Sequence, residues 1–386
     1  MDVQTIIANA RTQTGLEDTG LEDIGDPLAL EGLEALVKAS NEEARLSPRG
    51  AAMWEASITA YLVNRMKVID YLRQHPELEA RPITKPTFVF GLPRTGTTMT
   101  INLLSADPAR RCYRRWEALD SVPPVKQGED KSDQRYLAEV AKGEMAVKYM
   151  PQIAAIHWED ADSPSEDQYA MAQSFCSQIY DSQINIPGYR KWFFAADYEP
   201  AFRFQKRILQ LLQENVSGKW TLKNPWHPLF LDAMTTVFPD AELVMTHRDP
   251  VEVVGSACSL LKAVRPIYTE DMRLGEIAEC LLQTFDHMIA RQNAYRDKHG
   301  QDTIFDIQYA GQIKDPLGTM RALYERFDTP FTAQAQAGME AMMAYNPQGK
   351  HGKHAYTLEE FGLSAKWVRD HFKEYTDRYA VPVKEV

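Results

Sequence analysis

Apolar residues near the start of the chain recur at the three- and four-residue steps of a helix. The first set comprises Leu28, Leu30, Leu33, Leu36 and Val37. The second set comprises Trp54, Ile58, Tyr61, Leu62, Met66 and Ile69. They predict two amphipathic helices between residues 27 and 75. Two prolines then mark residues 81–86 as a linker, so we expect an N-terminal helical extension over residues 1–85 and one large domain over residues 86–386.

Beyond Pro86 the pattern changes to short apolar runs that alternate with helical stretches. Strands are expected at residues 87–90, 220–222, 241–246 and 303–308. A helix is expected after each of them, at residues 97–106, 228–237, 250–262 and 316–327. This alternation is typical of the α/β class and predicts a parallel sheet with helices on both faces.

Residues 109–219 separate the first two expected strands and carry mixed helical patterns, at residues 135–148, 166–180 and 199–213. We expect this region to form a helical lid over the carboxyl edge of the sheet, where ligands of such folds bind. Its aromatic and methionine residues include Trp158, Tyr169, Met171, Phe175, Tyr180, Tyr189, Trp192, Phe193 and Phe194. These side chains either line an apolar pocket or pack the lid onto the sheet.

Composition narrows the classes of function. The chain has 386 residues and a formal net charge of −11, which argues against general nucleic-acid binding but leaves room for a local cation cluster around one small anion. The cysteines lie far apart and match no metal-ligand spacing, so no metal site is expected. The first residues do not resemble a signal peptide, and no apolar run approaches the roughly 20 residues of a membrane span. We therefore expect no integral membrane segment and a cytoplasmic location.

A glycine loop at residues 91–96 carries the clearest chemical signal. A strand is expected to end at Gly91 and a helix to begin at Thr97, an order that presents free backbone N–H groups and the positive end of a helix to an oxyanion. The P-loop of a nucleoside triphosphatase would have a lysine where Thr97 stands, and this chain has a cation inside the loop instead, Arg94. The loop therefore predicts a phosphate cradle whose triphosphate chemistry is altered.

Further cations end two of the other expected strands. Lys223 lies in the segment T-L-K-N-P-W-H, and Arg248 lies in V-M-T-H-R-D-P. A basic stretch near the C-terminus, K-H-G-K-H, adds Lys350 and Lys353. Cations at the ends of parallel strands face one edge of the sheet, so Arg94, Lys223 and Arg248 are expected to converge on one polyanionic ligand.

Together these motifs resemble those of sulfotransferases that use 3′-phosphoadenosine 5′-phosphosulfate (PAPS). Residues 93–98 resemble their 5′-phosphosulfate loop, and Arg248, with Ser256 eight residues later, resembles their 3′-phosphate site. Residues 221–225 and the ending at residues 350–362 are similar to segments of bacterial members. The resemblance implies a P-loop-like sulfotransferase fold. It also implies transfer of a sulfuryl group from PAPS to a hydroxyl, which leaves adenosine 3′,5′-bisphosphate.

The resemblance also implies roles for individual residues. Arg94 and Lys223 are expected to act in catalysis, at the oxygen that bridges phosphate and sulfate. The residues expected to bind the donor are Arg94, Thr95, Gly96, Thr97, Thr98, Arg248, Ser256, Tyr309, Lys350 and Lys353. A sulfuryl group carries less charge than a phosphoryl group, so no metal is required. Met99 stands where the animal cytosolic branch has an adenine-stacking tryptophan, which leaves the stacking residue open.

The acceptor hydroxyl needs a general base. The animal cytosolic branch has a histidine two residues after the strand-end lysine, where this chain has Pro225. Other branches place a glutamate beyond the loop, and Glu117 fits that location, so we expect in-line attack with Glu117 as the base. Glu166 is the alternative carboxylate, and His157 and His227 are weaker candidates.

Two other functions fit part of the pattern. A P-loop nucleotide kinase or other phosphotransferase would share the cradle, although the P-loop lysine is missing and Asp249 is the one strand-end carboxylate near the place for Mg²⁺. A non-catalytic nucleotide-binding protein would keep the cradle without a base. The acceptor, whether a small molecule, a lipid or a glycan, and the oligomeric state stay open.

Overall fold

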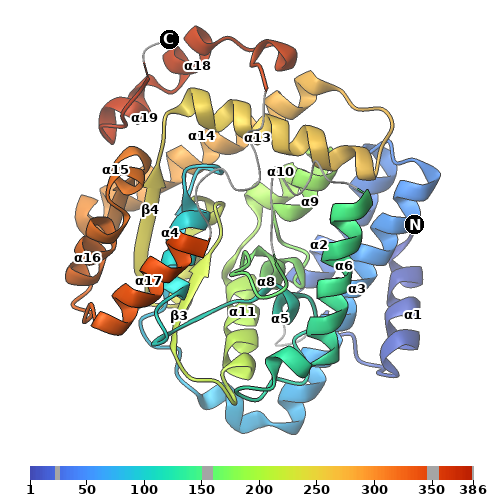
Figure 1. Ribbon diagram of the computed structural model, residues 1–386. Coiled ribbons are helices and arrows are strands. Elements are labelled where there is room, and N and C mark those ends of the chain that lie inside the picture. The colour runs from blue at the N-terminus through green and yellow to red at the C-terminus, as the bar shows by residue number, and fades with distance from the viewer. Residues whose placement is uncertain (22–26, 150–159, 346–355, 385–386) are drawn as a thin grey trace.

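The computed structural model describes residues 1–21, 27–149, 160–345 and 356–384 (Figure 1). Its centre is a parallel sheet of five strands in the order β2-β3-β1-β4-β5. The strands are β1 (Thr87–Gly91), β2 (Arg110–Cys112), β3 (Lys219–Lys223), β4 (Glu242–His247) and β5 (Ile304–Gln308). The predicted α/β class and four of these strands are confirmed. The short β2 was not predicted, because its sequence R-R-C has no strand-like apolar pattern.

Helices cover both faces of the sheet, as predicted (Figure 1). On one face Val89 of β1 packs in a cluster with residues of α4 (Thr97–Ser105), α16 (Pro316–Arg326) and α17 (Ala333–Tyr345). On the other face Phe88 and Phe90 join the main core. That core is formed with α11 (Glu199–Leu212), α12 (Leu231–Val237), α13 (Pro250–Val264) and α14 (Leu274–His299). This division follows from the period-two alternation of side chains along a strand.

The N-terminal helices share this main core. They are α1 (Val3–Thr14), α2 (Leu28–Glu42) and α3 (Pro48–Gln74), followed by the 3₁₀ turn η2 (Pro76–Ala80). Trp54 of α3 is fully buried and meets Tyr180 edge-on, with ring centroids 5.9 Å apart. Arg65 of α3 donates from Nε to the carbonyl of Gly20 at 2.8 Å and from Nη1 to Ser174 Oγ at 3.1 Å. The division of the chain at residue 85 stays a prediction.

The lid lies between β2 and β3. It contains α5 (Arg115–Leu119), η3 (Asp130–Ser132), α6 (Gln134–Tyr149), α8 (Gln168–Ala172), α9 (Ile179–Gln183) and α10 (Pro187–Ala195), and then α11. The helix expected at residues 166–180 is interrupted between α8 and α9. Phe175 there has φ of +51°, which no α-helix contains, and its carbonyl accepts a hydrogen bond from Tyr189 Oη at 2.8 Å. Tertiary contacts thus override the helical pattern.

The remaining helices and 3₁₀ turns connect these elements or form the C-terminal part of the chain. They are η4 (His227–Leu229), η5 (Arg265–Ile267), η6 (Gln301–Thr303), α15 (Tyr309–Lys314), η7 (Glu359–Phe361), α18 (Ala365–His371) and α19 (Lys373–Arg378). None of the helices in the described ranges combines the length and apolar character that a bilayer-spanning segment needs.

Candidate functional site

The glycine loop closes over the tips of β1 and β4. Gly91 has φ of +150°, and a Cβ there would lie 2.4 Å from the carbonyl oxygen of Thr246, so only glycine fits. Thr95 is buried, donates to the carbonyl of Leu92 at 2.6 Å and shares a 2.6 Å hydrogen bond with the Thr246 hydroxyl. α4 begins directly after the loop. Since the first N–H groups of a helix have no acceptor within it, the loop presents them as an anion cradle.

Arg94 lies inside the loop and joins it to the second predicted phosphate site. Its φ of +72° lies in the left-handed region, which residues other than glycine rarely adopt. Arg94 Nε donates to Ser256 Oγ at 2.9 Å, and Arg248 Nη1 donates to the Arg94 carbonyl at 3.0 Å. Burial, and then the charge of Arg248, lowers the pKa of Arg94. Two neighbouring guanidinium groups that repel each other favour the binding of an anion between them.

Arg248 is held by an aromatic ring on one side and a carboxylate on the other. Its guanidinium lies 4.4 Å from the centroid of the Tyr309 ring. Its Nε donates to Glu252 Oε2 at 2.9 Å. Burial by itself would raise the pKa of Glu252, but hydrogen bonds from Lys384 and Arg248 lower it on balance. Arg248 is therefore preorganised, and its Nε group is already bonded to the Glu252 carboxylate.

The C-terminal part of the chain reaches the same place. Tyr356 donates from its hydroxyl to the Glu252 carbonyl at 3.1 Å, and its ring occupies the space that a Cβ at Gly255 would fill. Burial raises the pKa of the Tyr356 hydroxyl, and the positive charges of Arg248 and Arg94 partly oppose this rise. Lys350 and Lys353, predicted to support the 3′-phosphate, lie outside the described residues.

Lys223 ends β3 and pairs with one of the two candidate base carboxylates. Its side chain is 1% exposed, and Nζ bonds Glu166 Oε1 at 2.8 Å. Residue 166 also pairs with residue 223 as an isolated parallel bridge, and the Asp167 N–H donates to the Lys223 carbonyl at 3.0 Å. The Glu166 carboxylate in turn acts electrostatically on Arg94. The structure thus gathers a carboxylate and two cations at the carboxyl edge of the sheet.

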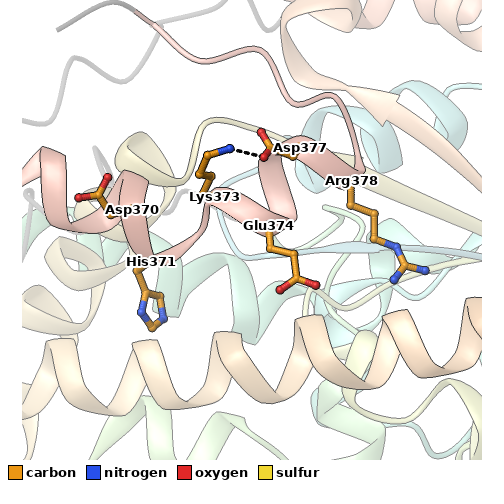
Figure 2. A pocket seen from close by; sticks show the side chains of 6 residues that line it. All are labelled: Asp370, His371, Lys373, Glu374, Asp377 and Arg378. Carbon is orange, nitrogen blue, oxygen red and sulfur yellow. Dashed lines mark hydrogen bonds and ion pairs between the residues drawn. The ribbon is translucent and has the colours of Figure 1, made fainter.

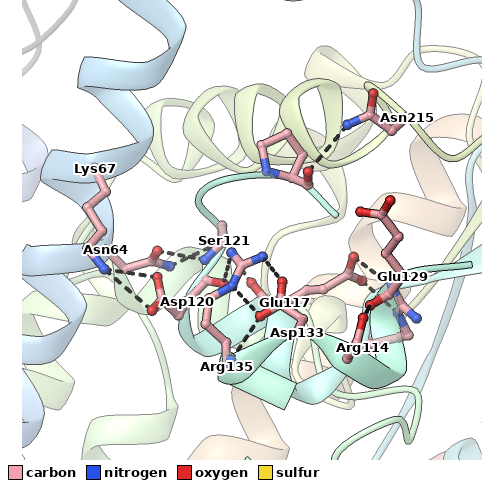
Figure 3. A network of polar contacts seen from close by, with 12 residues as sticks. Asn64, Lys67, Arg114, Glu117, Asp120, Ser121, Glu129, Asp133, Arg135 and Asn215 are labelled. Carbon is pink, nitrogen blue, oxygen red and sulfur yellow. Dashed lines mark hydrogen bonds and ion pairs between the residues drawn. The ribbon is translucent and has the colours of Figure 1, made fainter. Parts of the chain in front are cut away.

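Glu117 has a different environment (Figure 3). Its carboxylate is 1% exposed and accepts hydrogen bonds from Arg111 Nη2 at 3.0 Å and from Arg114 Nε and Nη2, both at 2.9 Å. Its carbonyl accepts from Ser121 Oγ at 2.8 Å, and Ser121 bonds Asn64 of α3. A carboxylate fixed by two arginines is well placed to hold α5 and β2 together and poorly placed to accept a proton.

The remaining candidates are placed as follows. His227 is fully buried and bonds Asp167, and His157 lies outside the described residues. Asp249 caps α13 through a 3.0 Å hydrogen bond from the Val251 N–H, a role that leaves it poorly suited to hold Mg²⁺. In the described part of the chain no group of three or more His, Cys, Asp or Glu side chains could hold a metal ion.

Most of the described lid aromatics pack the lid. Phe175, Tyr180, Tyr189 and Phe193 are at most 1% exposed and contact one another in the core. Tyr169, Trp192 and Phe194 are only partly buried, and Trp158 lies outside the described residues.

A separate hollow of about 710 Å³ lies at the C-terminal helices (Figure 2). Its lining comprises Asp370, His371, Lys373, Glu374, Asp377 and Arg378. Two of these side chains bond α14, His371 to Asp286 at 2.8 Å and Arg378 to Asp297 at 2.5 Å. None of the lining residues belongs to the predicted site, and their charges are mixed.

Comparisons with known proteins bear on the family and the fold. Residues 86–333 match the model of the Sulfotransferase family. The crystal structure of sulfotransferase STF9 from Mycobacterium avium superposes with a TM-score of 0.91 at 31% identity, covering 100% of this chain and 98% of that chain. The structure of sulfotransferase STF1 from Mycobacterium tuberculosis H37Rv gives a TM-score of 0.87 at 29% identity, covering 97% and 99%.

A curated relative is similar over a shorter stretch. The omega-hydroxy-beta-dihydromenaquinone-9 sulfotransferase Stf3 of Mycobacterium bovis is 24% identical over 179 residues. That stretch covers 46% of this chain and 44% of the relative, so this chain spans less than half of the relative's length.

Proposed function

The chain belongs to the sulfotransferase family, and we propose that it transfers a sulfuryl group from PAPS to the hydroxyl of an apolar small molecule or lipid. The fold and the family predicted from the sequence motifs are confirmed. One observation carries the proposal for the donor: Arg94, Ser256 and Arg248, from two separate motifs, form one hydrogen-bonded cluster beside the anion cradle.

The residues present fit a donor with phosphate and sulfate at one end and phosphate at the other. The cradle formed by Thr95, Gly96, Thr97 and Thr98 supplies backbone N–H groups for the 5′ end. Arg248 and Ser256 supply a guanidinium and a hydroxyl for the 3′-phosphate, and Tyr309 orients Arg248. Lys350 and Lys353 are proposed to support this end.

For the chemical step we propose Glu166 as the base in preference to Glu117, the residue expected from its place in the sequence. Glu166 lies against Lys223 and within the electrostatic reach of Arg94, whereas Glu117 is saturated by two arginines. The acceptor oxygen would bond to sulfur as the bond between sulfur and the bridging oxygen breaks, and its proton would pass to Glu166. Lys223, released from Glu166, would then stabilise the negative charge on the leaving bisphosphate.

An apolar acceptor is supported by two observations. The curated relative acts, by its name, on a hydroxylated menaquinone derivative. In this chain, partly buried Tyr169 follows Glu166 closely in sequence, and Arg115 Nη1 donates to its hydroxyl at 3.2 Å. A partly buried aromatic ring in the segment that follows the base offers apolar contact surface to such an acceptor.

Calorimetric titration with adenosine 3′,5′-bisphosphate tests the donor site, with 5′-AMP and Mg·ATP as controls. We expect binding that requires the 3′-phosphate and is independent of magnesium. Binding of Mg·ATP alone would favour a phosphotransferase instead. Transfer from radiolabelled PAPS to farnesol, cholesterol and 2-naphthol then tests the acceptor. Tight bisphosphate binding without transfer to any hydroxyl or to water would indicate a non-catalytic binding protein.

A further inference from the structure

A buried polar cluster lies next to the Glu166–Lys223 pair and has no part in the chemistry proposed above. It consists of Asp167, Gln205 of α11 and His227, each 0% exposed. Asp167 Oδ2 accepts hydrogen bonds from Gln205 Nε2 at 2.7 Å and from His227 Nε2 at 2.9 Å. A buried carboxylate is costly without such donors, so this cluster is a specific arrangement and not incidental packing.

The cluster connects the two chain segments that carry the proposed base and the catalytic lysine. Asp167 directly follows Glu166, and its N–H bonds the carbonyl of Lys223. His227 lies four residues beyond Lys223, in the turn that follows β3, where its N–H donates to the Asn224 carbonyl at 3.2 Å. The Asp167–His227 bond therefore attaches the segment of Glu166 to the segment of Lys223 at a second point.

Aromatic rings fix the imidazole of His227 in place. The rings of Phe88, Phe90, Phe202 and Phe230 have their centroids 5.2, 6.3, 5.9 and 6.0 Å from its own. Among the described residues, no hydrogen-bond partner is found for His227 Nδ1. The orientation of the ring is thus set by packing, and its polar interaction is directed at Asp167.

We propose that His227 is a positioning residue: through Asp167 it holds Glu166 beside Lys223 in the geometry needed for proton transfer from the acceptor. This inference rests on the proposed function, because it takes Glu166 as the base. The hydrogen bonds and ring contacts found for His227 involve neither residues 91–98 nor Arg248, so we expect its loss to leave donor binding intact. Misplacing a reacting group by about 1 Å costs on the order of 10²-fold in rate. Loss of the His227–Asp167 hydrogen bond should therefore lower kcat.

Two substitutions separate the hydrogen bond from the packing. His227→Phe keeps an aromatic ring in the cage but removes the donor to Asp167, whereas His227→Gln returns an N–H group. With PAPS as donor, and farnesol or water as acceptor, we expect His227→Phe to lower kcat about 10- to 100-fold at unchanged KM for PAPS. His227→Gln should recover most of that loss. In a Glu166→Gln background His227→Phe should cause no further loss, because the group that it positions is gone.

Amide hydrogen exchange supplies a readout that needs no acceptor. The Asp167 N–H, bonded to Lys223, should exchange faster in His227→Phe and return toward the wild-type rate in His227→Gln. Tyr324→Phe is the matched control, because it removes a 2.7 Å hydrogen bond to another buried carboxylate, Asp107, in the cluster on the opposite face of the sheet. We expect it to lower stability without changing kcat or the exchange of Asp167.

The outcomes distinguish this inference from the proposed function. Unchanged kcat in His227→Phe, a loss that adds fully to that of Glu166→Gln, or an unchanged Asp167 exchange rate would overturn the positioning role. A wild-type protein that releases no bisphosphate from PAPS with farnesol, cholesterol, 2-naphthol or water would overturn the proposed function itself. In that case the exchange measurement still decides whether His227 holds the segment of Glu166.

Discussion

Arg94 Nε donates a 2.9 Å hydrogen bond to Ser256 Oγ, although 162 residues separate them. Arg94 belongs to the loop proposed for the 5′ end of the donor, and Ser256 belongs to the helix proposed for its 3′-phosphate. One hydrogen bond therefore links the two halves of the site. When an anion binds, Arg94 and Ser256 have to direct hydrogen bonds to the ligand that they now direct to each other.

Ser256→Ala should weaken binding of adenosine 3′,5′-bisphosphate about 10- to 100-fold, the effect of losing one hydrogen bond to a charged group. Binding of 5′-AMP, which lacks the 3′-phosphate, should change little. Calorimetric titration of both nucleotides measures the difference. An equal loss for both would mean that Ser256 acts through Arg94 and not on the 3′-phosphate.

Glu166→Gln and Glu117→Gln form a matched pair that identifies the base. We expect Glu166→Gln to lower kcat about 10²- to 10⁴-fold while bisphosphate affinity is retained. Glu117→Gln should mainly lower the thermal midpoint, because it removes the charge that compensates buried Arg111 and partly buried Arg114. Should Glu117→Gln stay stable and show the larger loss of kcat, the base is Glu117, as the sequence predicted.

Gly96→Ala should damage the cradle through its backbone and through Tyr309. Gly96 has φ of +107°, and a Cβ there would lie 2.7 Å from Tyr309 Cδ2. We expect a loss of about 1–2 kcal/mol in the free energy of unfolding. Bisphosphate binding should also weaken, because Tyr309 must move away from Arg248.

The control for this substitution is Gly311→Ala in α15. Gly311 lies in a helix, and apart from its chain neighbours and the backbone of that helix no atom lies within 4 Å of a Cβ placed there. Alanine there should leave binding unchanged and stabilise the protein slightly. Chemical denaturation and titration of both variants test the pair, and equal behaviour would contradict the special role of Gly96.

The sequence predicted those features that are written in continuous patterns. The apolar strand β4 and the glycine loop between β1 and α4 are each determined by residues that are adjacent in the sequence. β2 was missed because it lacks an apolar pattern. Tertiary hydrogen bonds hold it in the sheet instead: buried Arg110 bonds Tyr324, Thr87 and Thr221. Contacts of that kind leave no local signal.

The proposed preference for Glu166 over Glu117 likewise depends on contacts that leave no local pattern in the sequence. Glu166 lies 57 residues before Lys223, and only the pairing of residue 166 with the end of β3 brings them together. Arg114 lies three residues before Glu117 in the sequence, but only the fold brings Arg111 of β2 to the same carboxylate. The strands, the helices and the glycine loop can thus be predicted from short stretches of sequence. The choice of base depends on which lid residue contacts the end of β3, and that is set by the tertiary structure.

His247, at the end of β4 just before Arg248, should make stability depend on pH. Its ring is fully buried; it donates from Nε2 to Asp306 Oδ1 at 2.8 Å and accepts at Nδ1 from the Tyr375 hydroxyl at 2.8 Å. These two bonds satisfy the neutral imidazole, and Arg296 already compensates the charge of Asp306. Burial lowers the pKa of His247 below its ordinary 6.5, although Asp306 acts in the opposite direction.

The unfolded chain therefore binds a proton at residue 247 more tightly than the folded chain does. The free energy of unfolding should fall as pH falls from about 6.5 through the lowered pKa of His247, by about 1.4 kcal/mol for each unit that separates the two pKa values. Urea denaturation of wild type and His247→Gln between pH 8 and 5 tests this. The difference between the two curves cancels His287, whose pKa is also lowered by burial. A difference that does not change over this range would show that His247 is protonated equally in both states.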